Sequence, residues 1–184
     1  VSANIVSSCS GTVKAVENRR TASGAKVMSV VIENDGQYTL AEGIGVERDY
    51  KMLGKEEILG SIQKAGIVGM GGAGFPTNVK VTPKNEEEID YVIVNGAECE
   101  PYLTSDYRLM LERPEDLIQG LHVVLSLFDN AKGVIAIEDN KPEAIAKLQY
   151  LTDSDPDIEV KVLKTKYPQG AERQVIYVTT GRKI

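Results

Sequence analysis

Residues 66–76 read Gly-Ile-Val-Gly-Met-Gly-Gly-Ala-Gly-Phe-Pro, with five glycines in the first nine positions. Because glycine lacks a Cβ atom, the backbone of such a stretch can approach a ligand closely. Successive backbone N–H groups in a glycine-rich loop form a concave site for anions. The stretch therefore predicts a site for a phosphate group, most simply that of a nucleotide or a flavin. A glycine-rich turn without a ligand is the alternative for this loop taken alone.

Three of these glycines satisfy the G-x-G-x-x-G pattern of dinucleotide-binding proteins, but the surrounding sequence does not suit that motif. Gly69, Gly71 and Gly74 stand at the required spacing. The motif follows a strand, whereas residues 55–65 have the apolar spacing of an amphipathic helix. A Walker A loop is excluded because Phe75 stands where that motif requires lysine. A standard dinucleotide site is therefore not expected here.

A second informative stretch, Asp-Tyr-Val-Ile-Val-Asn-Gly-Ala-Glu-Cys-Glu-Pro-Tyr, occupies residues 90–102. Residues 91–94 form an apolar, β-branched run that predicts a buried strand. Asn95, Glu98 and Glu100 follow directly, and ligands of open α/β sheets bind beyond the carboxyl ends of strands. Amide and carboxylate groups can bond the edge of a heterocycle or a ribose hydroxyl. A polar turn is the alternative, although two such loops in one small α/β unit favour a binding site.

Three motifs together resemble those of the RnfC family, and the resemblance covers most of the chain, from Ser7 onward. They are Gly-Met-Gly-Gly-Ala-Gly-Phe-Pro-Thr at 69–77 followed by Lys80, Asn-Gly-Ala-Glu-Cys-Glu-Pro at 95–101, and Tyr-Pro-Gln-Gly-Ala-Glu-Arg-Gln at 167–174 followed by Thr180-Gly-Arg. That family is the peripheral, nucleotide-facing subunit of the Rnf electron-transport complex. It is related to the NADH-binding flavoprotein subunit of respiratory complex I. RnfC-like proteins that serve proline reductase share the same body, so both roles stay open.

The resemblance implies a site for FMN and NAD(H). By that analogy the glycine loop lines the ring face and the phosphate of FMN, Lys80 lies near the phosphate or the flavin edge, and Asn95 and Glu98 contact the isoalloxazine or the ribityl chain. Phe75 would stack on the nicotinamide or adenine side of NAD(H), and Glu100 would approach a ribose. The full implied set is Gly69, Gly71, Gly72, Gly74, Phe75, Lys80, Asn95, Glu98, Glu100 and Glu172, with no catalytic residue and no metal ligand.

The chain departs from the complex I subunit at three positions of these motifs. Met70 replaces an arginine, Ala97 replaces an aspartate, and Ala171 replaces the first glutamate of a Gly-Glu-Glu motif whose second glutamate matches Glu172. The resemblance implies electron transfer between a nicotinamide and an iron–sulfur chain, with NADH and other subunits of a complex as partners. A docking module that has the fold but no flavin is the alternative that these departures keep open.

Composition and cysteine content limit the function further. The 184 residues are 42% hydrophobic and 26% charged, which is typical of a globular protein. The net charge of −6 and the lack of a basic stripe argue against a nucleic-acid partner. The longest apolar run, residues 123–128, is too short for membrane insertion. We expect a cytoplasmic protein, and the resemblance implies that it reaches the cytoplasmic face of the membrane through partner subunits. Cys9 and Cys99 are isolated, so this chain has no iron–sulfur ligand set of the usual spacing. The resemblance implies 4Fe–4S clusters only in a missing C-terminal part.

The pattern of elements predicts two segments. Residues 1–50 read as short strands at 13–16 and 27–33, which the resemblance identifies as part of a barrel-sandwich whose first half would precede Val1. Residues 51–184 read as an α/β domain, which the resemblance identifies as a Rossmann-like FMN-binding domain. Because strands alternate with helices there, a largely parallel sheet is expected. The predicted strands are 91–94, 133–137 and 158–163, and the predicted helices are 55–65, 114–130, 142–151 and 170–179.

Overall fold

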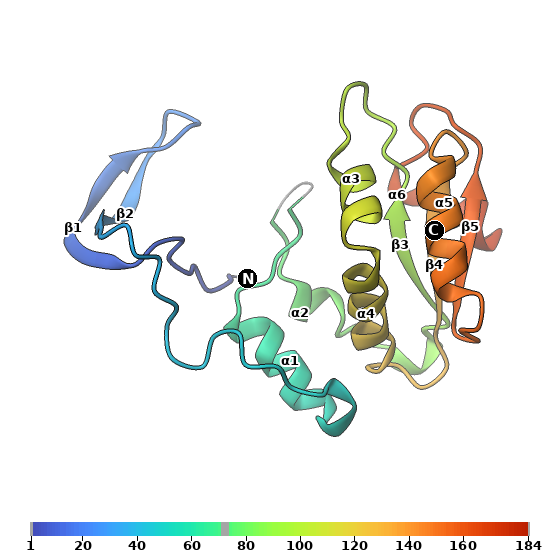
Figure 1. Cartoon of the computed structure of the whole chain (residues 1–184), viewed down its shortest axis with the longest axis horizontal. Coiled ribbons are helices and arrows are strands. Elements are labelled where there is room, and N and C mark those ends of the chain that lie inside the picture. The colour runs from blue at the N-terminus through green and yellow to red at the C-terminus, as the bar shows by residue number, and fades with distance from the viewer. Residues whose placement is uncertain (1, 71–73, 184) are drawn as a thin grey trace.

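The computed structural model describes residues 2–70 and 74–183 of the chain. The larger part is a three-stranded sheet with helices on both faces, and a two-stranded ribbon near the N-terminus stands apart from it (Figure 1). The helices are α1 (Lys55–Lys64), α2 (Thr77–Lys80), α3 (Ser105–Glu112), α4 (Pro114–Leu125), α5 (Pro142–Thr152) and α6 (Glu172–Thr180), with 3-10 turns at Tyr50–Met52 and Glu86–Glu88.

The sheet consists of β3 (Tyr91–Gly96), β4 (Lys132–Glu138) and β5 (Ile158–Leu163), in the order β3-β4-β5. Both strand pairs are parallel, so the predicted α/β class with a parallel sheet is confirmed. β4 lies in the middle, and residues 133–138 are all buried. This burial on both faces explains the uninterrupted apolar run Val-Ile-Ala-Ile at 134–137.

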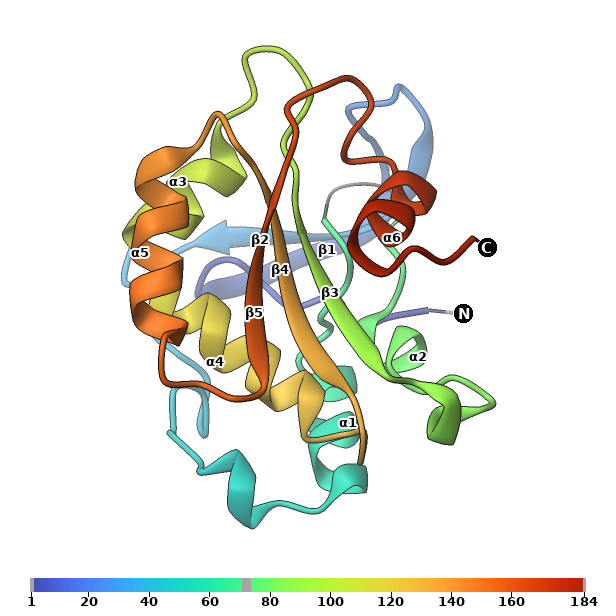
Figure 2. The same cartoon turned by 90° about the vertical axis from the view of Figure 1, so that its right-hand side faces the viewer.

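Helices α3, α4 and α5 cover one face of the sheet and α6 covers the other (Figure 2). The main core lies under the first three helices, where Met110 and Leu148 pack with Ile135. A smaller core joins α6 to the opposite face, where Val175 packs with Ala136. The sheet therefore separates a large hydrophobic layer from a thin one, and the thin layer carries α6.

The predicted helix 114–130 is too long, because α4 ends at Leu125. Two residues later Leu127 is buried in a third apolar cluster with Ile58 of α1 and Val81. Because Leu127 is buried in this cluster, the chain leaves the helix after Leu125. The Leu127 N–H bonds to the Val124 carbonyl at 3.1 Å. The competition between helix continuation and burial of one leucine is thus decided by tertiary packing.

The predicted strand 91–94 is too short, because β3 continues to Gly96. Asn95 stands opposite Ala136 of β4 and so belongs to the strand rather than to the loop after it. Helix α3 was not predicted from the sequence. The side chain of Thr104, at the N-terminal boundary of α3, does not cap that helix. The distant Glu98 caps it instead, accepting from Asp106 N at 3.0 Å and Tyr107 N at 3.2 Å.

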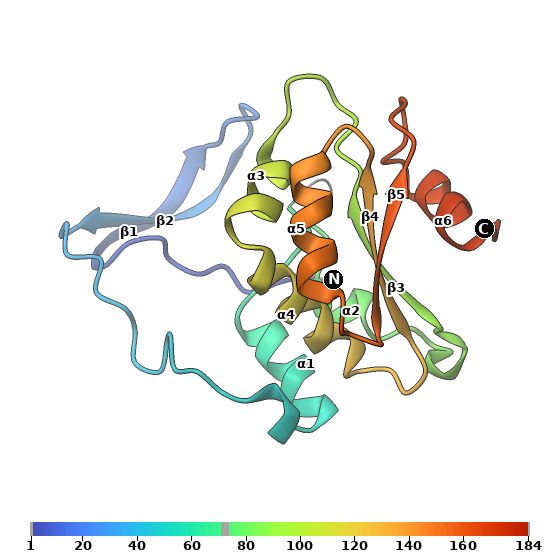
Figure 3. The ribbon, with the colours of Figure 1, turned by 45° about the vertical axis from the view of Figure 1, so that its right-hand side comes forward.

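The N-terminal ribbon pairs β1 (Gly11–Arg20) with β2 (Lys26–Asn34) in antiparallel register, and both strands are longer than predicted. Figure 3 shows the ribbon at a distance from the helices that cover the sheet. Apolar side chains on it stay exposed, among them Val16 and Met28. The division of the chain at residue 50 stays a prediction.

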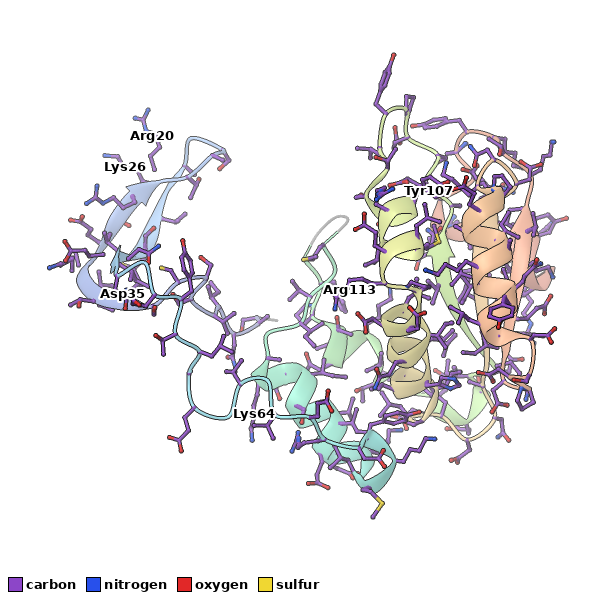
Figure 4. The ribbon with its side chains drawn as sticks, in the orientation of Figure 1. Arg20, Lys26, Asp35, Lys64, Tyr107 and Arg113 are labelled. Carbon is purple, nitrogen blue, oxygen red and sulfur yellow. The ribbon has the colours of Figure 1, made fainter. Side chains whose placement is uncertain are left out.

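Lysines of the ribbon lie at its surface. Lys14 forms an exposed ion pair with Glu33 at 2.5 Å. Lys26 and Arg20 lie together at one end of the ribbon, where their side chains extend into solvent (Figure 4). Exposed pairs of this kind contribute little to stability.

Asp139, which follows β4, fixes the loop after β5 and makes folding stability depend on pH. Its Oδ1 accepts from the Thr165 hydroxyl at 2.5 Å and from Thr165 N at 3.0 Å, and Oδ2 accepts from Lys164 Nζ at 3.0 Å. These bonds, that of the Thr165 hydroxyl first, lower the pKa of Asp139 from 3.8 to about 2. Because the unfolded chain then binds the proton more tightly, this contribution to the free energy of unfolding is present above about pH 4 and is lost as the pH falls toward 2.

We therefore expect Asp139→Asn to destabilise the protein at pH 7 and to do so progressively less below pH 4. Urea unfolding of both proteins at pH 7 and at pH 3 measures this difference. The exposed Asp153 provides the control, because Asp153→Asn removes the same charge without these bonds. A destabilisation by Asp139→Asn that is as large at pH 3 as at pH 7 would contradict the assignment.

The cap on α3 generates a second expectation. Glu98→Ala leaves the first N–H groups of α3 without their carboxylate acceptor, which should lower the free energy of unfolding by about 1 kcal/mol. Glu87→Ala removes an exposed carboxylate elsewhere and should change stability by less than about 0.5 kcal/mol. Thermal or urea unfolding at pH 7 compares the two variants, and equal effects would argue against the cap.

Candidate cofactor site

A cavity of about 950 Å³ lies between β3, α6 and the glycine-rich loop. β3 is an outer strand of the sheet, and the residues of β3 that line the cavity lie on the face that α6 covers. A volume of this order is typical of sites for nucleotide-sized ligands. The cavity is lined by Gly69, Gly74, Phe75, Lys80, Asp90, Tyr91, Ile93, Asn95, Glu172, Val175, Ile176, Thr180 and Arg182.

The strand contributes to the cavity through every second residue. Tyr91, Ile93 and Asn95 line it, while Val92 and Val94 pack against the main core. This division follows from the period of two in a β-strand, which sends successive side chains to opposite faces. The apolar run of β3 thus serves the core with one set of residues and the cavity with the other.

Helix α6 contributes residues that are four apart. Glu172, Ile176 and Thr180 share one helical face and all line the cavity, together with Val175. Val175 is buried and holds the helix on the sheet. The β-branched residues that weaken helix propensity in this segment therefore form its contact with the sheet and the cavity wall, and this packing outweighs propensity.

The two described arms of the glycine-rich loop pair with each other beside the cavity. Gly69 N bonds to Phe75 O at 2.9 Å, and Val68 forms an isolated antiparallel bridge with Pro76. Gly74 has φ +63°, a conformation that disfavours other residues, and a Cβ there would meet nothing within 4 Å. At Gly69 the nearest atom to an added Cβ is Phe75 O at 3.9 Å. The predicted positions Gly71 and Gly72 lie outside the described residues.

The polar residues at the carboxyl end of β3 are held by the turn that precedes α6. Asn95 Nδ2 donates to Gly170 O at 2.8 Å, and its Oδ1 accepts from Ala97 N at 3.2 Å. Gly170 N lies 3.4 Å from Cys99 Sγ, and a Cβ on Gly170 would come within 2.4 Å of Ala97 O. Only glycine permits this close approach, so residue 170 is fixed by the packing of the two loops.

Two of the predicted site residues stand apart from the cavity lining. Both oxygens of Glu98 face the start of α3, where they accept from three groups. Glu100 is exposed and hydrogen-bonds the Tyr167 hydroxyl, which raises the pKa of Tyr167. The remaining predicted residues that the structure describes, which are Gly69, Gly74, Phe75, Lys80, Asn95 and Glu172, all line the one cavity.

The opposite end of the cavity was not predicted from the sequence. There Arg182 Nη1 bonds to Asp90 Oδ1 at 2.8 Å, Nη2 bonds to Oδ2, and the guanidinium lies over the Tyr91 ring at 5.5 Å. The hydrogen bonds from Arg182 lower the pKa of Asp90, and the same pairing raises the pKa of Arg182. The two residues are 92 positions apart, and no sequence pattern connects them.

A second cavity, of about 830 Å³, lies between residues 6–10, the segment around 38–48 and α1. It contains none of the predicted site residues, so the cavity beside β3 is the candidate site. Within the described residues, no helix has the length and apolarity that crossing a membrane requires. His122 bonds Asp155 at 2.8 Å and lies away from the cavity lining.

The arrangement suits a planar ligand that carries a phosphate group. Tyr91, Ile93 and Val175 provide an apolar wall, and Phe75 is 48% exposed beside it. Lys80 and Arg182 supply positive charge, and Asn95 keeps one donor and one acceptor position beyond the bonds described above. The room left by the missing side chains at Gly69 and Gly74 lies on the loop side. These residues fit FMN.

Comparison with known proteins agrees with this geometry. Residues 62–184 match the family model described as the Nuo51 FMN-binding domain, and residues 1–37 match the RnfC barrel sandwich hybrid domain. The ribbon therefore corresponds to the predicted part of a barrel-sandwich.

Curated relatives carry the same relationship. The chain is 45% identical over all 184 residues to a component of the proton-translocating ferredoxin:NAD(+) oxidoreductase complex of Clostridium ljungdahlii, covering 40% of that protein. Identity is also 45%, over 42% of the relative, for a component of the Na(+)-translocating ferredoxin:NAD(+) oxidoreductase complex of Acetobacterium woodii. For a component of the ion-translocating oxidoreductase complex of Pectobacterium atrosepticum, identity is 40% over 95% of this chain and 25% of the relative. The chain spans less than half the length of these proteins. The predicted resemblance is confirmed, and the chain belongs to the Nuo51 FMN-binding domain family and is of the RnfC type.

Proposed function

We propose that this chain binds FMN and NAD(H) and forms the nucleotide-binding part of an electron-transfer subunit. In that role it passes electrons between a nicotinamide and an iron–sulfur chain within a larger complex. The cavity beside β3 carries the proposal, because six of the residues expected to hold the cofactors line it. The names of the relatives, which are subunits of ferredoxin:NAD(+) oxidoreductase complexes, support the same assignment.

The six predicted residues that line the cavity each have a part in this proposal. Gly69 and Gly74 leave room for the flavin and its phosphate, and Lys80 balances the phosphate charge. Asn95 is oriented by Gly170 O, so its free amide hydrogen and carbonyl lone pair are available to a ring edge. Phe75 offers an exposed aromatic face for a nicotinamide or adenine ring.

The carboxylates divide between binding and support. Glu172 begins α6 and lines the cavity, which suits hydrogen bonds to a ribityl or ribose hydroxyl. Glu98 holds the loop between β3 and α3 through its contacts with α3, and any flavin contact by Glu98 or Glu100 stays a prediction. When bound, FMN supplies exchange of two electrons with a nicotinamide and of single electrons with iron–sulfur clusters.

The partners and the location form the wider part of this proposal. We infer that the other subunits of an ion-translocating complex bind the protein at the cytoplasmic face of a membrane, and that 4Fe–4S clusters reside outside this chain. A soluble RnfC-like carrier that serves proline reductase is the second candidate, since it would use the same cavity. Proteins that copurify with the native protein distinguish the two: Rnf-type membrane subunits or proline reductase.

Titration with FMN tests the central claim. Saturable quenching of flavin fluorescence on addition of the purified protein, and a change in that signal on addition of NADH, are the expected results. If neither ligand gives a saturable change, the cofactor assignment is wrong, and a flavin-less docking module takes its place.

Gly69→Val tests the cavity itself. The new side chain would occupy space at the cavity wall, so FMN affinity should fall at least about tenfold, since even about 1.4 kcal/mol of lost binding has this effect. Stability should change little because, among the described residues that are not chain neighbours of Gly69, the nearest atom to the added Cβ is Phe75 O at 3.9 Å. Gly60→Val in α1 is the matched control, because its Cβ meets nothing within 4 Å and Gly60 lies outside the cavity lining. Equal FMN affinity of the two variants would place the flavin elsewhere.

A further inference from the structure

The cavity beside β3 has two polar ends separated by apolar residues. Asn95 and Glu172 mark one end, and Asp90 and Arg182 mark the other, with Ile93 between them along the strand. At a rise of about 3.3 Å per residue, the five steps from Asp90 to Asn95 span about 16 Å. The proposed cofactor contacts account for the first end and for the glycine loop, but they leave the Arg182 end without a ligand.

The guanidinium at this end is held in place and retains free donors. Two of its N–H groups bond to Asp90, and its face lies over Tyr91. The backbone N–H of Arg182 donates to the Thr180 hydroxyl at 3.2 Å, which fixes the chain just after α6. A guanidinium has five N–H donors, so three remain for another acceptor. The side chain is 58% exposed at the cavity, which leaves these donors accessible.

We propose that Arg182 binds a phosphate group of the nucleotide in this cavity, and that Asp90 orients its guanidinium when no phosphate is present. The planar fork of arginine matches phosphate oxygens in a bidentate geometry. The identity of the nucleotide rests on the proposed function, and the phosphate is that of FMN or that of the NAD(H) diphosphate.

In this arrangement Asp90 weakens phosphate binding, whereas Arg182 strengthens it. Its carboxylate occupies two of the five guanidinium donors and leaves three free, but its negative charge repels an incoming phosphate. Removing that charge therefore strengthens phosphate binding. If the ion pair had only a structural role, holding the end of α6 at the start of β3, loss of either partner would weaken ligand binding at the site. The two roles thus predict opposite results for a change at Asp90.

The test compares ligands that differ only in the phosphate. Three proteins are compared: the unsubstituted chain and its variants Arg182→Gln and Asp90→Asn. Each protein is titrated with FMN, with riboflavin and with NADH. Arg182→Gln should lower affinity for a phosphate-bearing nucleotide about tenfold or more, as expected for loss of a charge-assisted hydrogen bond, and leave riboflavin affinity unchanged. Asp90→Asn should raise affinity for the same nucleotide. Arg173→Gln, which removes an exposed arginine of α6 outside the cavity lining, controls for net charge.

The outcomes separate this inference from the proposed function. A loss in Arg182→Gln confined to FMN, or confined to NADH, supports the phosphate site and identifies its source. If Arg182→Gln loses equal affinity for FMN and for riboflavin, or if Asp90→Asn binds the nucleotide more weakly, the phosphate site is wrong. The ion pair then has only a structural role. If the unsubstituted chain binds neither nucleotide, the proposed function fails. Calorimetric titration with inorganic pyrophosphate then measures whether the chain still binds an anion through Arg182. Binding that disappears in Arg182→Gln then supports the site, and absence of binding overturns it.

Discussion

The contact between α6 and the sheet determines where a ligand can bind. Val175 is buried against Ala136 and Leu163, and this small cluster is the apolar attachment of α6 to its face of the sheet. The opposite face is packed much more extensively, by three helices. A second face of α6, which carries Glu172, Ile176 and Thr180, lines the cavity together with β3 and the glycine-rich loop. A loss of packing at Val175 would therefore remove one wall of the cavity while the main core stays intact.

Hydrogen bonds of single polar residues then fix the loops around this space. Glu98 ties the loop after β3 to α3, Asn95 ties β3 to the turn before α6, and Asp139 ties the end of β4 to the loop after β5. All three residues lie at the carboxyl edge of the parallel sheet, where the strands end together. Loops positioned in this way need little reordering when a ligand binds, and this lowers the entropic cost of binding.

The sequence predicted the strands and most helices well because their apolar periodicities are long and clear, as at 158–163, where the strand agrees residue for residue. It failed where distant contacts decide. Burial of Leu127 ends α4 early, and the cap on α3 comes from Glu98, seven residues before the helix begins. The glycine and Asn95 end of the cavity was predicted from motifs, whereas the ion pair of Asp90 with Arg182 joins residues 92 apart and leaves no local signal.

Packing explains one of the positions at which the chain departs from the flavoprotein of complex I. Ala97 is 8% exposed and packs in the cluster that holds α6 on the sheet. An aspartate there would bury a charge among apolar groups, which is costly without a partner, so alanine suits the attachment of α6. Met70 is 94% exposed, so its identity has no bearing on the core. The change at position 97 is therefore explained by packing and does not by itself argue for a docking module without flavin. Lys80 and Arg182 line the cavity, so the absence of an arginine at position 70 does not leave it without positive charge.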